Sequence, residues 1–453
     1  MRILIIGGSH AGIAAARHLR KINKEVEIIL IEKADVLGYV GSSLNLYLEK
    51  EIDYLEDGFT ATIDELLAEK IQVHLKSTVT SINAQKKVVH YFSKVHDQKK
   101  EVSLAYDFLI LAMGSSQYNS EFSIEATEQI THYKTLEQAE KAVQTLENAE
   151  TVVIIGAGLI GLEMAETLSR LKKEVYLIDR MDSLLFRYFD HEISSLLAQN
   201  FPTNVHLLLN NEIRDIQTDE EKKNVGVRLA NGKLLVADAI LYAINPRPTI
   251  DLIEDQLTIN MDGTISTNEF LQTSDPDIYA AGDLVAVSFN HTDETLYIPL
   301  VTNAYRTGII AATNILLGNT IAFPGSQRTI VSQLFNYYLA STGINEEEAP
   351  YFDLQTASVT NTYTKSRLFG EEQDNFSLTI KIVYDPKTKK LIGGQLLTPD
   401  EKTVEIINIL SALVAKETTL NQLATMDFFF NPKLSLPIHF LNDLAMTGIL
   451  QEE

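Results

Sequence analysis

The sequence of 453 residues contains no cysteine. This absence excludes disulfide bonds, cysteine-ligated zinc, iron–sulfur clusters and every thiol nucleophile. Basic residues are also scarce, since 38 Lys and Arg stand against 61 Asp and Glu and leave a formal net charge of −23. Nonspecific binding to nucleic acid or to an anionic membrane needs a positive surface, so we expect neither as a partner.

Long apolar runs are missing as well. No run approaches the ~18 apolar residues of a membrane span, and the apolar stretch 3–6 is too short for a signal peptide. We therefore expect a cytoplasmic protein. The hydrophobic share of 45% is typical of a globular chain, and the length corresponds to about three domains of ~150 residues.

Two segments of the chain share one pattern: an apolar strand, a glycine turn, a helix, and a second apolar strand that ends in an acidic residue. This is the pattern of a dinucleotide-binding unit. Continuous apolar strands are typical of parallel sheets covered on both faces, so the fold class expected is α/β with two Rossmann-like domains. The first segment has strands at 3–6 and 26–31, a helix that ends near residue 22, and the acidic residue Glu32. The second has strands at 151–155 and 175–178, a helix that ends near residue 171, and the acidic residue Asp179.

The second glycine motif is complete. Gly156 makes the tight turn, Gly158 lets the backbone approach a pyrophosphate, and Gly161 permits close packing of helix and strand. Asp179 can bind both ribose hydroxyls and repels a 2′-phosphate, which favours NADH over NADPH, although Arg180 beside it weakens that preference. A glycine turn without a ligand is the alternative, and the strand–helix–strand–acid context disfavours it.

The first glycine motif is degraded, because Ser9 replaces the middle glycine between Gly7 and Gly12. Its position at the N-terminus, with Glu32 placed for a ribose, matches the FAD site of flavoproteins that bind two dinucleotides. Asp283 follows a glycine turn at Gly282 and suits a bond to the ribityl hydroxyls of a flavin. The alternative role for Asp283 is a helix cap.

Further strands are expected at 108–112, 239–243 and 278–281, and a helix from near Pro299 to Leu317. After residue 325 the pattern changes to strands at 375–384 and 391–397 with a helix near 401–416, which indicates a third, α+β domain. The predicted domains are an FAD-binding domain at 1–115 and 245–322, an NAD(H)-binding domain at 116–244, and a C-terminal dimerisation domain at 323–453.

Taken together, these motifs resemble the pyridine nucleotide–disulfide oxidoreductase superfamily, in particular its branch of NADH peroxidases, NADH oxidases and coenzyme A-disulfide reductases. The resemblance covers essentially the whole chain and implies FAD, NADH and a homodimer. The segments that carry it are 7–12, 156–161 with Glu163, 247–248, 280–283, 341–345 and 427–432.

One departure from this branch concerns the redox centre. The branch carries its redox cysteine in a segment that matches 38–48, and Ser42 occupies the cysteine position. A hydroxyl cannot take up two electrons as a thiol does, so thiol-based reduction of peroxides or disulfides is excluded there. Four further residues also depart from the pattern, which favours a naturally diverged site over an engineered one: Gly38, Gly41, Ser43 and Asn45.

The resemblance also implies roles for single residues. His10 matches the active-site histidine of the branch, Glu163 would lie near the nicotinamide–flavin contact, and Leu159 replaces an aromatic gate residue. For His10 and Glu163 the alternative is a plain polar residue on a helix, and a nucleophile pair of Ser42 with His10 has no recognisable acidic partner. The aromatic segment 428–430 would cover the site of the partner subunit or belong to the core. Further cofactor contacts are implied at Lys33, Ala112, Gly114, Gly282, Pro299 and Leu300.

The function expected is therefore that of an FAD-dependent NADH:acceptor oxidoreductase without the redox thiol, an NADH oxidase that forms H2O2 from O2. Two alternatives stay open. One uses a quinone, a dye or a protein as acceptor, and the other is a catalytically idle paralogue that binds FAD and NAD. The ten histidines show no zinc-type spacing, so no metal is expected.

Overall fold

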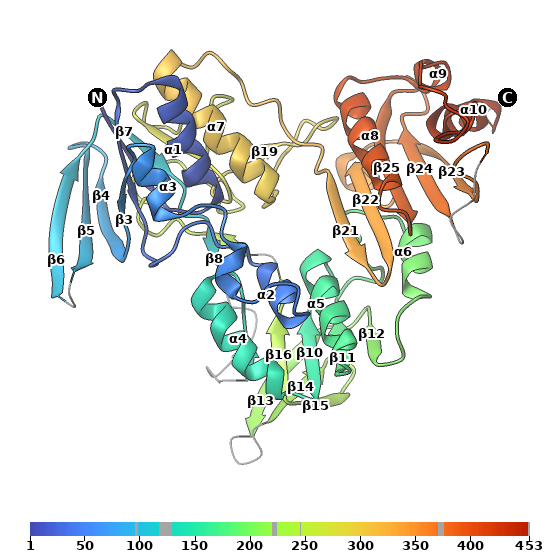
Figure 1. The fold of residues 1–453 in the computed structure, drawn as a ribbon, viewed down its shortest axis with the longest axis horizontal. Coiled ribbons are helices and arrows are strands. Elements are labelled where there is room, and N and C mark those ends of the chain that lie inside the picture. The colour runs from blue at the N-terminus through green and yellow to red at the C-terminus, as the bar shows by residue number, and fades with distance from the viewer. Residues whose placement is uncertain (96–97, 117–128, 220–223, 245, 370–375, 452–453) are drawn as a thin grey trace.

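A computed structural model describes residues 1–95, 98–116, 129–219, 224–244, 246–369 and 376–451. Asn245 and the start of the strand expected at 375 lie outside these ranges. The described residues form three regions, each built on its own five-stranded sheet (Figure 1). None of the described helices is long and apolar enough to cross a membrane.

The first region has a parallel sheet with the N-terminal strand at its centre. Two helices, α1 and α7, pack side by side against this sheet (Figure 1). Its strands, in sheet order, are β18 (Ile278–Ala280), β7 (Phe108–Leu111), β1 (Arg2–Ile6), β2 (Glu27–Ile31) and β3 (Gln72–His74). It also contains α1 (His10–Ile22), α3 (Ile63–Ala68), α7 (Val301–Leu317) and an antiparallel sheet of β4 (Ser77–Asn83), β5 (Val88–Val95) and β6 (Gln98–Ala105).

The second region repeats this plan with another parallel sheet. Its strands, in sheet order, are β12 (Val205–Leu208), β11 (Glu174–Ile178), β10 (Thr151–Ile155), β16 (Ala239–Tyr242) and β9 (Ile130–Thr131). Its helices are α4 (Leu136–Asn148), α5 (Leu159–Arg170) and α6 (His191–Ala198), and its antiparallel strands are β13 (Ile213–Asp219), β14 (Asn224–Leu229) and β15 (Leu234–Ala237).

The two glycine turns have the same geometry. Gly7 has a φ of 109° and Gly156 a φ of 106°, a region that favours glycine. A Cβ on Gly12 would lie 1.9 Å from the Gly7 carbonyl oxygen, and one on Gly161 would lie 1.9 Å from that of Gly156. In both units the missing side chain lets the helix pack directly on the turn, so the predicted internal repeat and α/β fold are confirmed.

The third region is α+β, as predicted. Its antiparallel sheet carries three helices, and every residue of β24 and β25 is buried. In sheet order its strands are β21 (Ile330–Leu334), β22 (Tyr337–Gly343), β25 (Leu391–Thr398), β24 (Leu378–Tyr384) and β23 (Ala357–Tyr363), and its helices are α8 (Ile406–Ala415), α9 (Leu420–Ala424) and α10 (Phe440–Gln451).

Short elements join the regions. The two chain crossings between the first and second regions pair with each other as β8 and β17. The short elements of the described residues are α2 (Ser43–Leu48), β8 (Ser115–Ser116), β17 (Arg247–Pro248), β19 (Val287–Ser288), β20 (Thr295–Leu296) and 3₁₀ turns at Leu55–Gly58, Ala349–Phe352 and Thr403–Glu405.

A buried arginine connects all three regions. Arg328 forms a bidentate ion pair with Glu348, and the two side chains are only 5% and 9% exposed. The guanidinium also lies 5.3 Å from the ring centroid of Tyr188 in the second region and 4.8 Å from that of Phe289 in the first. Arg328 is therefore a buried, ion-paired side chain at the place where the three regions contact one another.

A second buried cation holds α6 against the C-terminal sheet. The ammonium of Lys381 lies 2.9 Å from Asp190, 2.8 Å from Glu192 and 2.6 Å from Glu346. These carboxylates raise the pKa of Lys381, although burial alone would lower it. Gln395 donates a further hydrogen bond to Asp190 at 2.7 Å. This cluster fixes the second region relative to the third.

Candidate functional site

The complete glycine motif sits at the N-terminus of α5. Gly158 precedes the helix with a φ of −78°, and a Cβ built on it would meet nothing within 4 Å. Asp179, at the end of β11, accepts hydrogen bonds from the N–H of Ala157 at 2.7 Å and of Met181 at 2.8 Å. The first turn of the helix has no acidic residue, so no carboxylate of that turn opposes the positive end of the helix dipole.

The degraded motif is arranged in the same way at the N-terminus of α1. Glu32 accepts hydrogen bonds from the N–H of Gly8 at 2.6 Å and of Ala34 at 2.8 Å. Ser9 is exposed, precedes the helix and makes no capping bond with its side chain. This exposed serine stands at the position where the second motif has Gly158.

Helices α1 and α7 bring their N-termini to one end of the first region. They pack closely because Gly308 has no side chain: a Cβ there would lie 2.3 Å from the Ala11 carbonyl oxygen. The rings of His10 and Tyr305, near the two N-termini, lie 5.7 Å apart. Neither helix has an acidic residue in its first turn. Two positive helix ends consequently face the same place.

Asp283 lies at this place, on the turn after β18. Ser115 donates to it at 2.5 Å, and the ammonium of Lys134 lies 3.1 Å away and also contacts Ser115. Burial lowers the pKa of Lys134, and Asp283 opposes that shift. No helix begins at Asp283, so the alternative role as a helix cap is wrong. Sequence reasoning missed Lys134, because a lone lysine before a helix belongs to no motif.

His10 is the first residue of α1 and half-buried. Burial lowers the pKa of its imidazole, the charge of Asp283 opposes this shift, and Lys134 adds to it. The Nδ1 atom is buried and has no hydrogen-bond partner among the described residues. Burial therefore favours the neutral ring, and its Nδ1 is available to a ligand.

Ser42 is exposed and precedes α2, and its hydroxyl makes no capping hydrogen bond. Among the described residues no hydrogen bond joins it to His10, so the structure does not assemble a nucleophile pair. The other end of α2 is fixed to α5, because Glu49 accepts hydrogen bonds from Thr167 at 2.7 Å and from Arg170 at 2.9 Å.

Glu163 lies in the second turn of α5 and accepts a hydrogen bond from Ser332 of β21 at 2.7 Å. Burial raises the pKa of its carboxyl, the Ser332 hydroxyl lowers it, and Glu166 raises it. The sequence indicated Glu163 but not Ser332, which lies 169 residues further on.

The structure also describes the other residues that were predicted to contact a cofactor. Gly114 has a φ of 70° and open space at its Cβ position, Ala112 is buried beneath Gly7, and Lys33 is exposed beside Glu32. Leu159 is the first residue of α5 and packs on the core of the second region. Pro299 and Leu300 directly precede α7, as expected.

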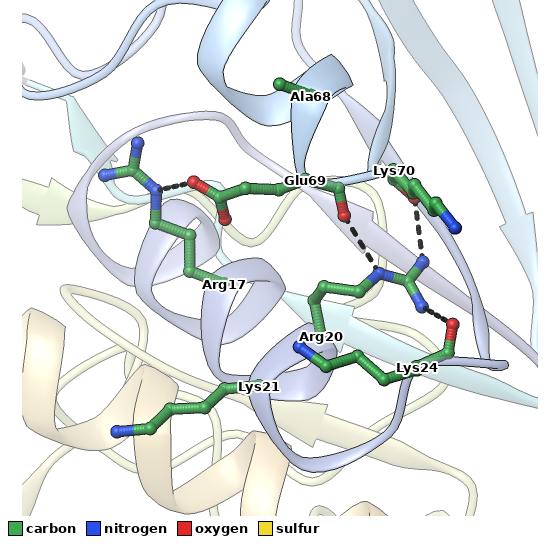
Figure 2. Close-up of a pocket in the computed structure, with 7 residues that line it drawn as sticks. All are labelled: Arg17, Arg20, Lys21, Lys24, Ala68, Glu69 and Lys70. Carbon is green, nitrogen blue, oxygen red and sulfur yellow. Dashed lines mark hydrogen bonds and ion pairs between the residues drawn. The ribbon is translucent and has the colours of Figure 1, made fainter.

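A cavity of about 320 Å³ lies at the opposite end of α1. Figure 2 shows Arg20 at its centre, donating to the carbonyls of Glu69, Lys70 and Lys24. Arg17 is paired with Glu69 at 3.0 Å. Arg20 donates hydrogen bonds to carbonyls at the C-terminal ends of α1 and α3 and so connects the two helices. This cavity therefore has a structural role.

The fold and the site define a protein with two dinucleotide-binding units and an α+β C-terminal domain. The chain belongs to the pyridine nucleotide-disulphide oxidoreductase family. Residues 1–308 match the model of that family, and residues 331–439 match the model of its dimerisation domain.

Several known proteins are similar to this chain over nearly its whole length. An NADH oxidase of Enterococcus faecalis is 29% identical over 452 residues, with 99% of each chain covered. The structure of the water-forming NADH oxidase of Lactobacillus brevis, bound to NADH, is similar with a TM-score of 0.93 and 26% identity, over 100% of this chain and 98% of that one. An NAD-dependent persulfide reductase from A. fulgidus has a TM-score of 0.91 and 26% identity, over 100% of this chain and 83% of that one.

Proposed function

We propose that this chain is an FAD-dependent NADH oxidase that reduces O2 to H2O2. The observation that carries the proposal is the combination of two well-formed dinucleotide units with a serine at the position of the redox cysteine. The names of the NADH oxidase relatives support NADH as donor and O2 as acceptor. Because the chain contains no cysteine, the peroxide formed has no thiol to reduce it to water.

The residues around the first glycine motif fit FAD. The turn presents N–H groups and an exposed Ser9 hydroxyl to a phosphate, and Glu32 stands where a ribose would bind. Asp283, hydrogen-bonded to Ser115, offers a carboxylate for hydroxyl groups of the ligand. When bound, FAD supplies hydride acceptance from NADH and two-electron transfer to oxygen.

The protein contributes binding and electrostatics to the net reaction NADH + H⁺ + O2 → NAD⁺ + H2O2. The N-termini of α1 and α7 stabilise negative charge where they meet, and Lys134 adds a cation there. His10, whose pKa is lowered by burial and whose Nδ1 has no partner among the described residues, can hold or release a proton at that nitrogen. Ser42 supplies a polar surface and no redox chemistry.

The product ratio tests the proposal. Under air, each NADH consumed is expected to yield one H2O2, because no thiol is present for a second two-electron step. The experiment follows NADH absorbance, O2 uptake and peroxide together, with catalase added in a parallel run to return half of the O2. Water formation without free peroxide, or a flavin that NADH does not reduce anaerobically, would refute the proposal.

The preference for NADH depends on Asp179. We expect Asp179→Ala to lower the ratio of kcat/KM for NADH to that for NADPH by about tenfold to a hundredfold, because the repulsion of a 2′-phosphate is removed and Arg180 becomes available to it. Steady-state kinetics with both nucleotides measure the ratio. Glu174→Ala, on the exposed start of the same strand, is the control, and an unchanged ratio in Asp179→Ala would contradict the assignment.

We further propose a cytoplasmic homodimer. The match to the dimerisation domain supports the dimer, and large apolar side chains are exposed on the C-terminal region. These side chains are Phe369, Phe429, Phe430, Leu434, Ile438 and Leu450. Phe428, by contrast, packs on the core beside His439, so the aromatic segment 428–430 divides between core and surface.

A further inference from the structure

Two carboxyl groups, the half-buried Glu163 and the buried Glu166, lie on one face of α5 because the two residues are three apart. Their partners differ. Glu166 accepts a hydrogen bond from Arg170 at 2.6 Å and another from the backbone N–H of Phe335. Glu163 has only the hydroxyl of Ser332, and no cation is paired with it within the described ranges.

Ser332 is unusual for its position in β21. Burial alternates along this strand, so that Ile330, Ser332 and Leu334 face the interior while Val331 and Gln333 face solvent. A core-facing position of this kind normally holds an apolar side chain. Ser332 is only 5% exposed, and a buried hydroxyl is costly without a partner. Its partner is the Glu163 carboxyl, which belongs to a different domain.

The groups around Glu163 are few. Glu166 lies one turn along the helix, Tyr133 lies beside it with its own hydroxyl donated to the Ile160 carbonyl, and Ser332 faces it from the C-terminal sheet. Burial and Glu166 favour the neutral carboxyl, and the Ser332 hydroxyl favours the carboxylate. The hydrogen bond from Ser332, across the domain boundary, therefore opposes the effect of burial and of Glu166 on the charge of Glu163.

We propose that Ser332 is a positioning residue that sets the preference of the nicotinamide site between NAD⁺ and NADH through the charge of Glu163. The inference rests on the proposed function and on the position of the nicotinamide near Glu163 that the family resemblance implies. An oxidised nicotinamide ring is cationic and a reduced one is neutral, so a nearby carboxylate favours NAD⁺. By donating to Glu163, Ser332 orients that carboxyl group and favours its charged form.

The test is the pH dependence of NAD⁺ binding to the oxidised holoenzyme, which needs neither oxygen nor turnover. The dissociation constant is measured by flavin fluorescence from about pH 4 to pH 9. This range covers the pKa values of both exposed and buried glutamates. NAD⁺ affinity is expected to rise with pH as Glu163 ionises. In Ser332→Ala this rise should move about one pH unit upward, which weakens NAD⁺ binding up to about tenfold between the two midpoints.

Four further variants separate this role from a structural one. Ser332→Thr keeps the hydroxyl and should keep the wild-type pH profile. Glu163→Gln should show no rise of NAD⁺ affinity with pH. Adding Ser332→Ala to Glu163→Gln should change the profile no further. Ser358→Ala removes a hydroxyl that donates to another glutamate, Glu346, at 2.6 Å in the same domain, and should leave the profile unchanged. Melting temperatures verify that each variant folds.

The proposal is overturned if wild-type NAD⁺ affinity has no such pH dependence, or if Ser332→Ala leaves the midpoint unchanged. It is equally overturned if the shift persists in the Glu163→Gln background. Failure of the proposed function has a different signature, because a water-forming or idle enzyme would change the peroxide yield and not the NAD⁺ titration.

Discussion

Gly158→Val is expected to leave the fold intact and to lower kcat/KM for NADH by about a hundredfold or more. The φ of −78° suits any residue, and a Cβ there meets nothing within 4 Å, so valine introduces neither strain nor a clash within the protein. Its branched side chain instead fills the space through which a pyrophosphate must approach the helix N-terminus. Steady-state NADH oxidation and the melting temperature measure the two effects.

Gly161→Val is the matched control within the same motif. A Cβ at this position would lie 1.9 Å from the Gly156 carbonyl oxygen, so the helix must move away from the turn. This variant should lose both thermal stability and NADH turnover, whereas Gly158→Val loses turnover alone. Retention of NADH affinity in Gly158→Val would mean that the dinucleotide does not pass over this turn.

The two dinucleotide units could be predicted from the sequence because their determinants are local. Each glycine turn, its helix and its acidic residue lie within about 30 residues, the length of one such unit. The roles of the glycines follow from backbone geometry, so Gly7 and Gly156 could be recognised without knowledge of the rest of the chain. The degraded motif could still be recognised, because a side chain is accommodated at the position of Ser9 but not at Gly7 or Gly12.

The residues that sequence reasoning missed act over long distances along the chain. Lys134 reaches Asp283 across 149 residues, and Ser332 reaches Glu163 across 169. Neither forms a spaced motif with its partner, and both come from a region other than that of the group they contact. Ser332 did leave a faint signal, a polar residue at the inward position of an alternating strand, which becomes informative only when its partner is known.

The largest loss of stability is expected from Arg328→Met. The substitution removes the cation and leaves Glu348 buried without a partner, a change that typically costs about 3–5 kcal/mol. Its packing between Tyr188 and Phe289 is partly kept by the methionine side chain. We expect the melting temperature to fall by about 10 °C. Scanning calorimetry of the holoenzyme provides the measurement.

A double variant tests whether the cost comes from the unpaired carboxylate. Arg328→Met with Glu348→Leu removes both charges and should regain most of the lost stability, because a buried pair replaced by apolar groups is often nearly neutral. Arg2→Met is the matched control, since Arg2 forms a bidentate pair with Glu27 in which both side chains are more than a third exposed. That change should shift the melting temperature by no more than about 3 °C. If Arg328→Met behaves like Arg2→Met, the contact between the three regions is held by apolar packing, and the ion pair is incidental to it.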